Sequence, residues 1–234
     1  MKKLIIVAND GRQTGKTAFT RVLEQFYQRK GIEPMAIYTD ASAAPDESAF
    51  WDLEEDLTPA RLEAYLEETD ALIVDISTGR AAEITEFFND NEIFDTLLDL
   101  DTELCIATPI HDTKASIDSL VTLADGFADN AEYLVLHSPH PGATRPADWA
   151  GSYGNKVMGY LGAIDIAVPE FDPGMDGQLA EHDMDLATGL CCRQDLPRFL
   201  RDALHKWELS YSDSLEKAME QLIPDTSQTR SVYA

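Results

Sequence analysis

Residues 3–17 read KLIIVANDGRQTGKT, and this stretch decides the fold. It begins with a run of apolar side chains over residues 4–8, which is long enough for one buried strand. The run ends at Asn9, and a polar turn that contains glycine leads to Gly15-Lys16-Thr17. Apolar residues then recur at helical spacing from Phe19 to Tyr27. This spacing predicts an amphipathic helix directly after the turn.

A strand, a glycine-bearing loop, GKT and a helix form the context in which a phosphate-binding loop is expected. Main-chain N–H groups of such a loop surround phosphate oxygens, and the positive end of the next helix adds to the attraction. We expect the Lys16 ammonium to reach the β- and γ-phosphates and the Thr17 hydroxyl to bind Mg²⁺. The predicted nucleotide-binding residues of this loop are Asp10, Gly11, Arg12, Gln13, Thr14, Gly15, Lys16, Thr17 and Ala18.

The loop departs from the pattern G-x-x-x-x-G-K-[ST] at one place. Asp10 stands at the first glycine position, and the glycine comes one residue later, at Gly11. A surface turn with an incidental lysine is therefore the alternative interpretation of this stretch.

Length and composition favour one cytoplasmic α/β domain. The 234 residues, 44% of them hydrophobic, can bury a large core. No apolar stretch approaches the roughly 18 residues of a membrane span, and the short apolar run near the N-terminus lacks a signal-peptide cleavage site. Cys105, Cys191 and Cys192 fit neither a disulfide framework nor a metal site. We expect one domain over residues 1–223 and a loose tail over residues 224–234.

The net charge of −25, from 43 acidic side chains against 18 Lys and Arg, limits the choice of partners. Such a field repels nucleic-acid phosphates and disfavours DNA binding by a monomer. A highly soluble acidic surface and a site for a basic protein partner both remain open as explanations. DNA contact is expected only from a dimer that concentrates the basic side chains near the C-terminus, which are Arg193, Arg198, Arg201 and Lys206.

Further apolar runs alternate with segments of helical periodicity. They predict strands over residues 35–39, 71–75, 104–108, 131–136 and 164–168. One further helix is expected to begin at residue 58, and a weak one to end at residue 161. The other expected helices cover residues 81–100, 113–128, 178–190 and 196–222, and Asp112 is a candidate cap of the helix 113–128. This alternation predicts a doubly wound, mostly parallel sheet with helices on both faces. Ligands of such sheets bind beyond the carboxyl ends of the strands.

Two carboxylates at predicted strand ends complete the expected site. Asp75 ends a buried strand and would hold Mg²⁺ opposite Thr17, directly or through a water. Asp40 ends the second strand and would orient or activate the attacking water, and it is a second candidate metal ligand. Gly79 would let the backbone move as switch segments do. The alternative for each of the three is an ordinary turn residue, and for Gly79 the two interpretations are equally open.

The order of the phosphate loop, Asp40, Asp75, Pro109 and residues 168–170 resembles that of the ParA/MinD family of deviant Walker ATPases over about residues 2–200. The resemblance implies a P-loop NTPase fold of the SIMIBI-like type. It also implies a slow ATPase that uses ATP and Mg²⁺ and forms a homodimer with nucleotide. Such a switch would act in plasmid partition, conjugal transfer or intracellular positioning.

Two positions depart from the family pattern. Members typically carry K-G-G-x-G-K-[ST], whose first lysine reaches across the dimer, and that lysine falls on Gly11 here. Arg12 is the neighbour that would replace it as a catalytic residue, beside Lys16 and Asp40. His137 stands where the family's strand usually ends in a base-contacting asparagine. We expect His137, Pro169 and Glu170 to border the base.

Two other functions stay open. Dethiobiotin synthetase resembles the chain around residues 15–17 and also lacks the signature lysine, so a small-molecule ligase or kinase is one of them. Against it, no second basic residue stands near the predicted helix to bind a carboxylate substrate. The other is a protein that holds nucleotide without significant turnover, which the missing lysine would allow.

Overall fold

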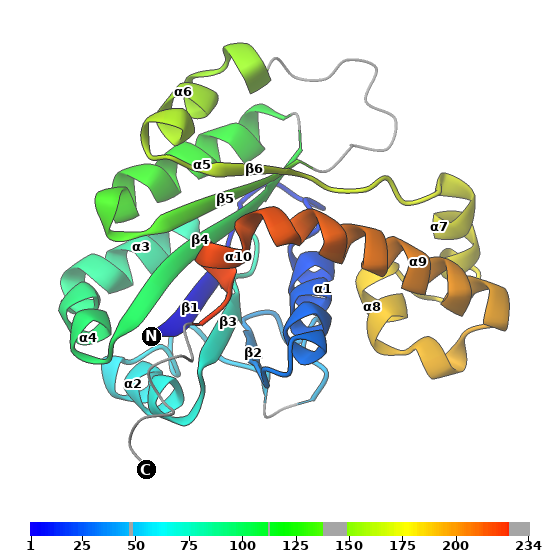
Figure 1. The fold of residues 1–234 in the computed structure, drawn as a ribbon, viewed down its shortest axis with the longest axis horizontal. Helices are drawn as coiled ribbons and strands as arrows, with labels where there is room; N and C mark the ends of the chain where they lie inside the picture. The colour runs from blue at the N-terminus through cyan, green and yellow to red at the C-terminus, as the bar shows by residue number, and fades with distance from the viewer. Residues whose placement is uncertain (47–48, 112, 138–148, 225–234) are drawn as a thin grey trace.

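In a computed structural model of the chain, the described residues are 1–46, 49–111, 113–137 and 149–224. They form a sheet of six parallel strands in the order β2-β3-β1-β4-β5-β6 (Figure 1). The strands are β1 (Lys2–Val7), β2 (Met35–Tyr38), β3 (Ala71–Asp75), β4 (Thr102–Ile110), β5 (Glu132–His137) and β6 (Ile164–Ala167). The predicted α/β fold class is therefore confirmed. The predicted tail lies outside the described residues from residue 225 onward.

Helices cover both faces of the sheet. One apolar layer contains residues of α1 (Lys16–Arg29), α7 (Pro173–Ala180), α8 (Leu186–Cys191), α9 (Arg198–Leu215) and α10 (Met219–Leu222). The other contains residues of α2 (Pro59–Glu68), α3 (Ala81–Asp90), α4 (Ile93–Asp99), α5 (Lys114–Phe127) and α6 (Tyr153–Tyr160). The inner strands therefore have an apolar environment on both sides, which explains their apolar runs, whereas the edge strand β6 alternates and exposes Asp165 and Ala167. No helix among the described residues has the length and apolar character needed to cross a membrane.

Three predicted helices are interrupted in the structure: 196–222 is divided into α9 and α10 by a 3₁₀ turn over Glu216–Ala218, and two others break at a residue with a left-handed backbone. The segment 81–100 forms α3 and α4, because Glu92 between them takes a left-handed backbone with φ 54°. The segment 178–190 contains the end of α7 at Ala180 and the start of α8 at Leu186, and Asp183 between them has a left-handed backbone with φ 57°. The Asp185 carboxylate caps α8 by accepting a hydrogen bond from Thr188 N at 2.8 Å. Neither left-handed break contains a glycine or a proline that would mark it in the sequence. Thr113, whose hydroxyl accepts from Ser116 N, caps α5; Asp112 lies outside the described residues.

Pro109 lies inside β4, although the sequence predicts that it closes the strand. Ala107 faces β1, since its carbonyl accepts from Ala8 N at 3.1 Å. Main-chain N–H and C=O groups of alternate residues face the same neighbouring strand, so the backbone of Pro109 also faces the side of β1. No residue of β1 lies opposite Pro109, because β1 ends at Val7, which pairs with Ala107. The missing N–H of proline therefore breaks no ladder hydrogen bond.

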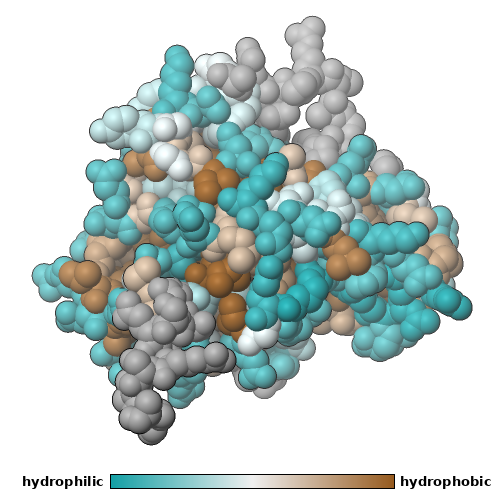
Figure 2. Space-filling view, viewed as in Figure 1, coloured by the Kyte–Doolittle hydropathy of each residue, from teal (hydrophilic) through white to brown (hydrophobic). Residues whose placement is uncertain are grey.

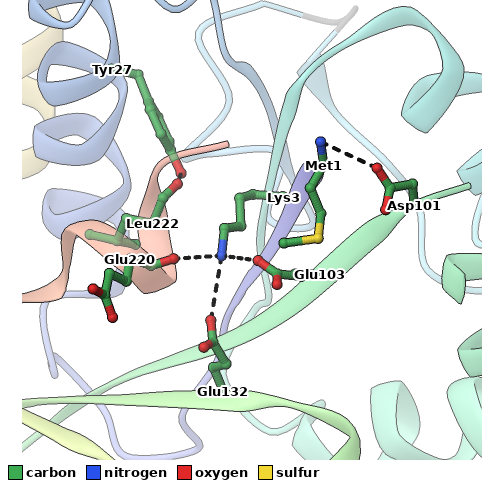
Figure 3. Close-up of polar contacts among 8 residues, drawn as sticks. All are labelled: Met1, Lys3, Tyr27, Asp101, Glu103, Glu132, Glu220 and Leu222. Carbon is green, nitrogen blue, oxygen red and sulfur yellow. Dashed lines mark hydrogen bonds and ion pairs between the residues drawn. The ribbon is translucent and has the colours of Figure 1, made fainter. Parts of the chain in front are cut away.

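A buried lysine near the start of β1 attaches α10 to the sheet (Figure 3). The Lys3 ammonium is 1% exposed and contacts Glu103, Glu132 at 3.4 Å and the carbonyl of Glu220 at 2.7 Å. The Tyr27 hydroxyl donates to the carbonyl of Leu222 nearby. The carbonyls that end α10 thus find donors from β1 and α1.

The basic residues near the C-terminus do not act as one group. Arg193 pairs with Glu208, which is 1% exposed and also binds Arg29 at 2.6 Å. This buried cluster joins α1 to α9. Arg198, Arg201 and Lys206 remain exposed on α9, with Arg198 3.7 Å from Asp202. The surface seen in Figure 2 is mainly hydrophilic with scattered apolar patches.

Candidate functional site

The register of the sheet brings the three predicted site strands to one edge. Val7 and Tyr38, the last residues of β1 and β2, both pair with Asp75 at the end of β3. The chain continues this alignment past the strands, since Ile76 N donates to Val7 O at 2.9 Å and Thr39 N donates to Asp75 O at 3.0 Å. The loop after β1, Asp75 and the loop that begins at Asp40 therefore leave the sheet together.

The loop after β1 has the backbone of an anion-binding turn. Gln13 and Gly15 take left-handed conformations, with φ of 55° and 89°. Gly15 precedes α1 directly and offers no side chain to cap it, so the first N–H groups of this 14-residue helix are available to an anion. His111, just after β4, contacts the Gln13 carbonyl through Nε2. The loop is thereby fixed to the sheet from the side of β4.

Asn9 organises the start of the loop. Its side-chain amide is 1% exposed and donates to Thr108 Oγ1 at 3.1 Å and to the Ser116 carbonyl at 3.0 Å. Its Oδ1 accepts from Gly11 N at 2.7 Å. The side chain thus joins β4 and α5 to the phosphate loop. In the sequence alone Asn9 marks only the end of a strand, because Thr108 and Ser116 are distant in the chain.

Lys16 is buried at the first position of α1 and points back across the loop. Its ammonium donates to the Asn9 carbonyl at 2.8 Å and to Thr78 Oγ1 at 2.9 Å. Burial lowers the pKa of Lys16 below its usual range, and the nearby carboxylates of Asp75, Asp10 and Asp40 oppose that shift. The ammonium therefore lies where main-chain N–H groups and carboxylates converge.

Asp75 is the buried carboxylate of the site. Burial raises the pKa of Asp75 to about 7, while a hydrogen bond from Thr17 and the charges of Lys16 and Arg21 act in the opposite direction. Its Oδ2 is buried and has no hydrogen-bond partner among the described residues. A buried carboxylate oxygen without a partner is unfavourable unless a ligand or water completes it.

These side chains fit a magnesium ion that is shared with phosphate. Mg²⁺ usually keeps several waters and takes one or two protein oxygens, with substrate phosphates completing its octahedron. The Thr17 hydroxyl and Asp75 supply that number. Within the described part of the chain, no three His, Cys, Asp or Glu side chains gather to hold a metal on their own. A metal here would therefore depend on the phosphates of a nucleotide.

The two other predicted acidic residues stabilise turns in the structure. Asp40 is exposed, and its Oδ1 accepts from Ser42 N at 2.9 Å and from Ser42 Oγ at 2.7 Å. Arg21 of α1 holds the same loop by donating to the Ala43 carbonyl at 2.8 Å. Asp10 Oδ1 accepts from main-chain N–H groups of the turn between β3 and α3. A role of Asp40 in water activation stays a prediction.

Packing around Gly11 explains why a lysine is missing there. A Cβ atom at this position would lie 2.8 Å from Asn9 Oδ1, 2.9 Å from Thr14 Cγ2 and 3.0 Å from Ser116 Cβ. Any side chain would force the loop to shift. Arg12, the next residue, is exposed and makes no hydrogen bond or ion pair within the described residues. Its guanidinium is therefore free to meet phosphate or a second molecule.

The residues expected around the base lie at the ends of β5 and β6. His137 pairs with Asp165 at 2.9 Å and packs edge-on against Trp149, with ring centroids 5.0 Å apart. The carbonyl of Pro169 accepts from Trp207 Nε1 at 2.8 Å. Glu170 is exposed. His137 pairs with Ala167 in the register, and Val168 N donates to the His137 carbonyl at 2.9 Å, so the three residues leave the same end of β5 and β6. Their role at the base stays a prediction.

Comparison with known proteins finds a solved structure with a similar fold. No family model and no curated protein matches the sequence. Among solved structures, the chain is similar to the MinD cell division protein of Aquifex aeolicus, with a TM-score of 0.52 and 15% sequence identity. The similarity covers 95% of this chain and 99% of that one. The chain therefore shares the α/β fold of that protein.

Proposed function

We propose that this chain is a cytoplasmic, Mg²⁺-dependent ATPase that hydrolyses ATP slowly and works as a molecular switch of ParA/MinD type. The observation that supports it best is the meeting of Lys16, Thr17 and Asp75 at one sheet edge. The unpaired Asp75 oxygen beside the Thr17 hydroxyl is the arrangement that a magnesium ion on a nucleotide requires. The MinD-like fold agrees with this assignment.

Each residue of the site has a distinct role in the proposal. Lys16 binds the β- and γ-phosphates, and the N–H groups at the start of α1 surround them. Thr17 and Asp75 hold Mg²⁺, which when bound offsets charge on the two phosphates. Asp40 orients the attacking water, and its loop is already positioned by Arg21. Arg12 stabilises charge on the transferred phosphoryl group in place of the signature lysine.

We further propose that ATP drives the formation of a homodimer. The exposed, unpaired Arg12 is placed at the surface where a second copy could reach it. A basic protein partner would read the dimer, as the charge of −25 favours. Plasmid partition, conjugal transfer and intracellular positioning are the processes in which such a switch would act.

A second candidate is a nucleotide-binding protein without significant turnover. The packing around Gly11 favours it, because the position of the signature lysine cannot take a side chain in this loop. Under this alternative ATP would bind as above and stay intact for hours.

Phosphate release and size-exclusion chromatography test the choice. With ATP and Mg²⁺ the wild type should release phosphate slowly and elute as a dimer, but with ADP or no nucleotide it should elute as a monomer. Salt of about 0.15 M screens repulsion between the acidic copies. Lys16→Ala should abolish both effects, whereas Lys114→Ala, an exposed lysine of α5, should change neither. Bound ATP that stays intact, with a monomeric protein, would overturn the switch and favour the second candidate.

A further inference from the structure

The turn that follows β3 holds Lys16. The ammonium donates to the Asn9 carbonyl and, at 2.9 Å, to the hydroxyl of Thr78 in the turn between β3 and α3. An ammonium group has three N–H donors, so these contacts leave one for a ligand. Thr78 is exposed and does not belong to the phosphate loop. No local sequence pattern marks it, because its contact depends on β1 and β3 being neighbours in the sheet.

A nucleoside triphosphate requires more of Lys16 than a diphosphate does. The lysine of a phosphate loop reaches both the β- and the γ-phosphate. With one donor kept on the Asn9 carbonyl, contact with both phosphates uses the two others, and the bond to Thr78 must break. A diphosphate offers only the β-phosphate, which the free third donor can reach while Thr78 stays bound.

We propose that Thr78 competes with the γ-phosphate for Lys16, so that the β3–α3 turn distinguishes a nucleoside triphosphate from a diphosphate. The inference rests on the proposed nucleotide site and adds a regulatory contact to it. When the triphosphate takes Lys16, the turn loses its attachment at Thr78. When only a diphosphate remains, the Lys16 ammonium again donates to the Thr78 hydroxyl, and the turn returns to the conformation described here.

A second contact to the same turn limits how far it moves. Asp10 Oδ1 accepts from Gly79 N at 2.9 Å and from Ala81 N at 3.1 Å. Neither bond involves Lys16, so phosphate does not compete for them. Gly79 has φ 90°, a left-handed backbone that glycine adopts without strain. The Thr78 side of the turn is thus released while the start of α3 stays attached to the phosphate loop.

Calorimetry with ATP and ADP, each with Mg²⁺, tests the competition in two variants. Thr78→Val removes the hydroxyl and keeps the branched shape, whereas Thr78→Ser keeps a hydroxyl. Because no bond to Lys16 has to break, Thr78→Val should bind ATP about three- to tenfold more tightly than the wild type. Its affinity for ADP should be unchanged, and Thr78→Ser should match the wild type with both nucleotides.

The outcomes separate this inference from the proposed function. Equal ATP affinity in the wild type and Thr78→Val overturns the competition and leaves the nucleotide site intact. An equal gain for ATP and ADP overturns it as well, since the effect would then be independent of the γ-phosphate. Failure of all three proteins to bind ATP overturns the proposed function together with the competition. Binding of ATP by Thr78→Val alone supports the competition.

Discussion

Burial sets the chemistry of Asp75. A carboxylate at the end of a parallel strand is surrounded by the neighbouring strands and by α1, so water reaches little of it. The resulting rise of its pKa to about 7 means that, without a metal, the neutral acid predominates below about pH 7. Mg²⁺ needs the charged form, so metal binding releases a proton there. The Thr17 hydroxyl and the Lys16 ammonium are the groups that favour the charged form.

The pH dependence of stability should report this burial. Between the ordinary pKa of 3.8 and about 7, the folded protein keeps a proton on Asp75 that the unfolded chain has lost. Stability therefore falls as pH rises through this window. Asp75→Asn lacks the titration, so without nucleotide its free energy of unfolding relative to the wild type should rise by about 2–4 kcal/mol between pH 4 and pH 8.

Urea unfolding of both proteins across that range measures the difference. Asp202→Asn, on the exposed face of α9, serves as the control for losing one surface carboxylate. A constant difference between Asp75→Asn and the wild type from pH 4 to pH 8 would contradict the buried, neutral carboxylate.

The loop between β1 and α1 is the element whose packing matters most. Gly11 is enclosed by Asn9, Thr14 and Ser116, so Gly11→Ala should destabilise the protein by about 1–3 kcal/mol. Gly159 of α6 has open space around its Cβ position, and Gly159→Ala should stabilise by about 0.5–1 kcal/mol through helix propensity. Urea unfolding compares the two. If Gly11→Ala proves as stable as the wild type, position 11 has room for the signature lysine after all.

The sequence predicts elements well where one local pattern decides them. Buried strands of a parallel sheet show apolar runs, so the inner strands are predicted to within a few residues, and the edge strand β6 is predicted despite its exposed Asp165. Breaks such as Glu92 and Asp183 are not, because a left-handed residue need not be glycine. The strand-end position of Asp75 is likewise predictable. The contacts of Asn9, Arg21 and Thr78 are not, since each partner comes from another element of the folded chain.

At the scale of the whole molecule, charge and fold act in different ways. The alternation of apolar runs with helical segments is enough to indicate the fold class, and the similarity to MinD agrees with it. The charge of −25 does not bear on the fold, but two copies of this chain repel each other. In the proposed dimer, nucleotide held between the copies would have to offset this repulsion. Every function proposed for the chain thus depends on a triphosphate bound at the loop between β1 and α1.

Titration calorimetry of the wild-type chain with ATP and Mg²⁺ tests this dependence. We expect saturable heat with one nucleotide bound per chain, and no heat with Lys16→Ala, because the ammonium and the N–H groups of α1 bind the phosphates together. An absence of heat in the wild type with millimolar ATP, and again with GTP, would contradict the nucleotide site and every function proposed from it.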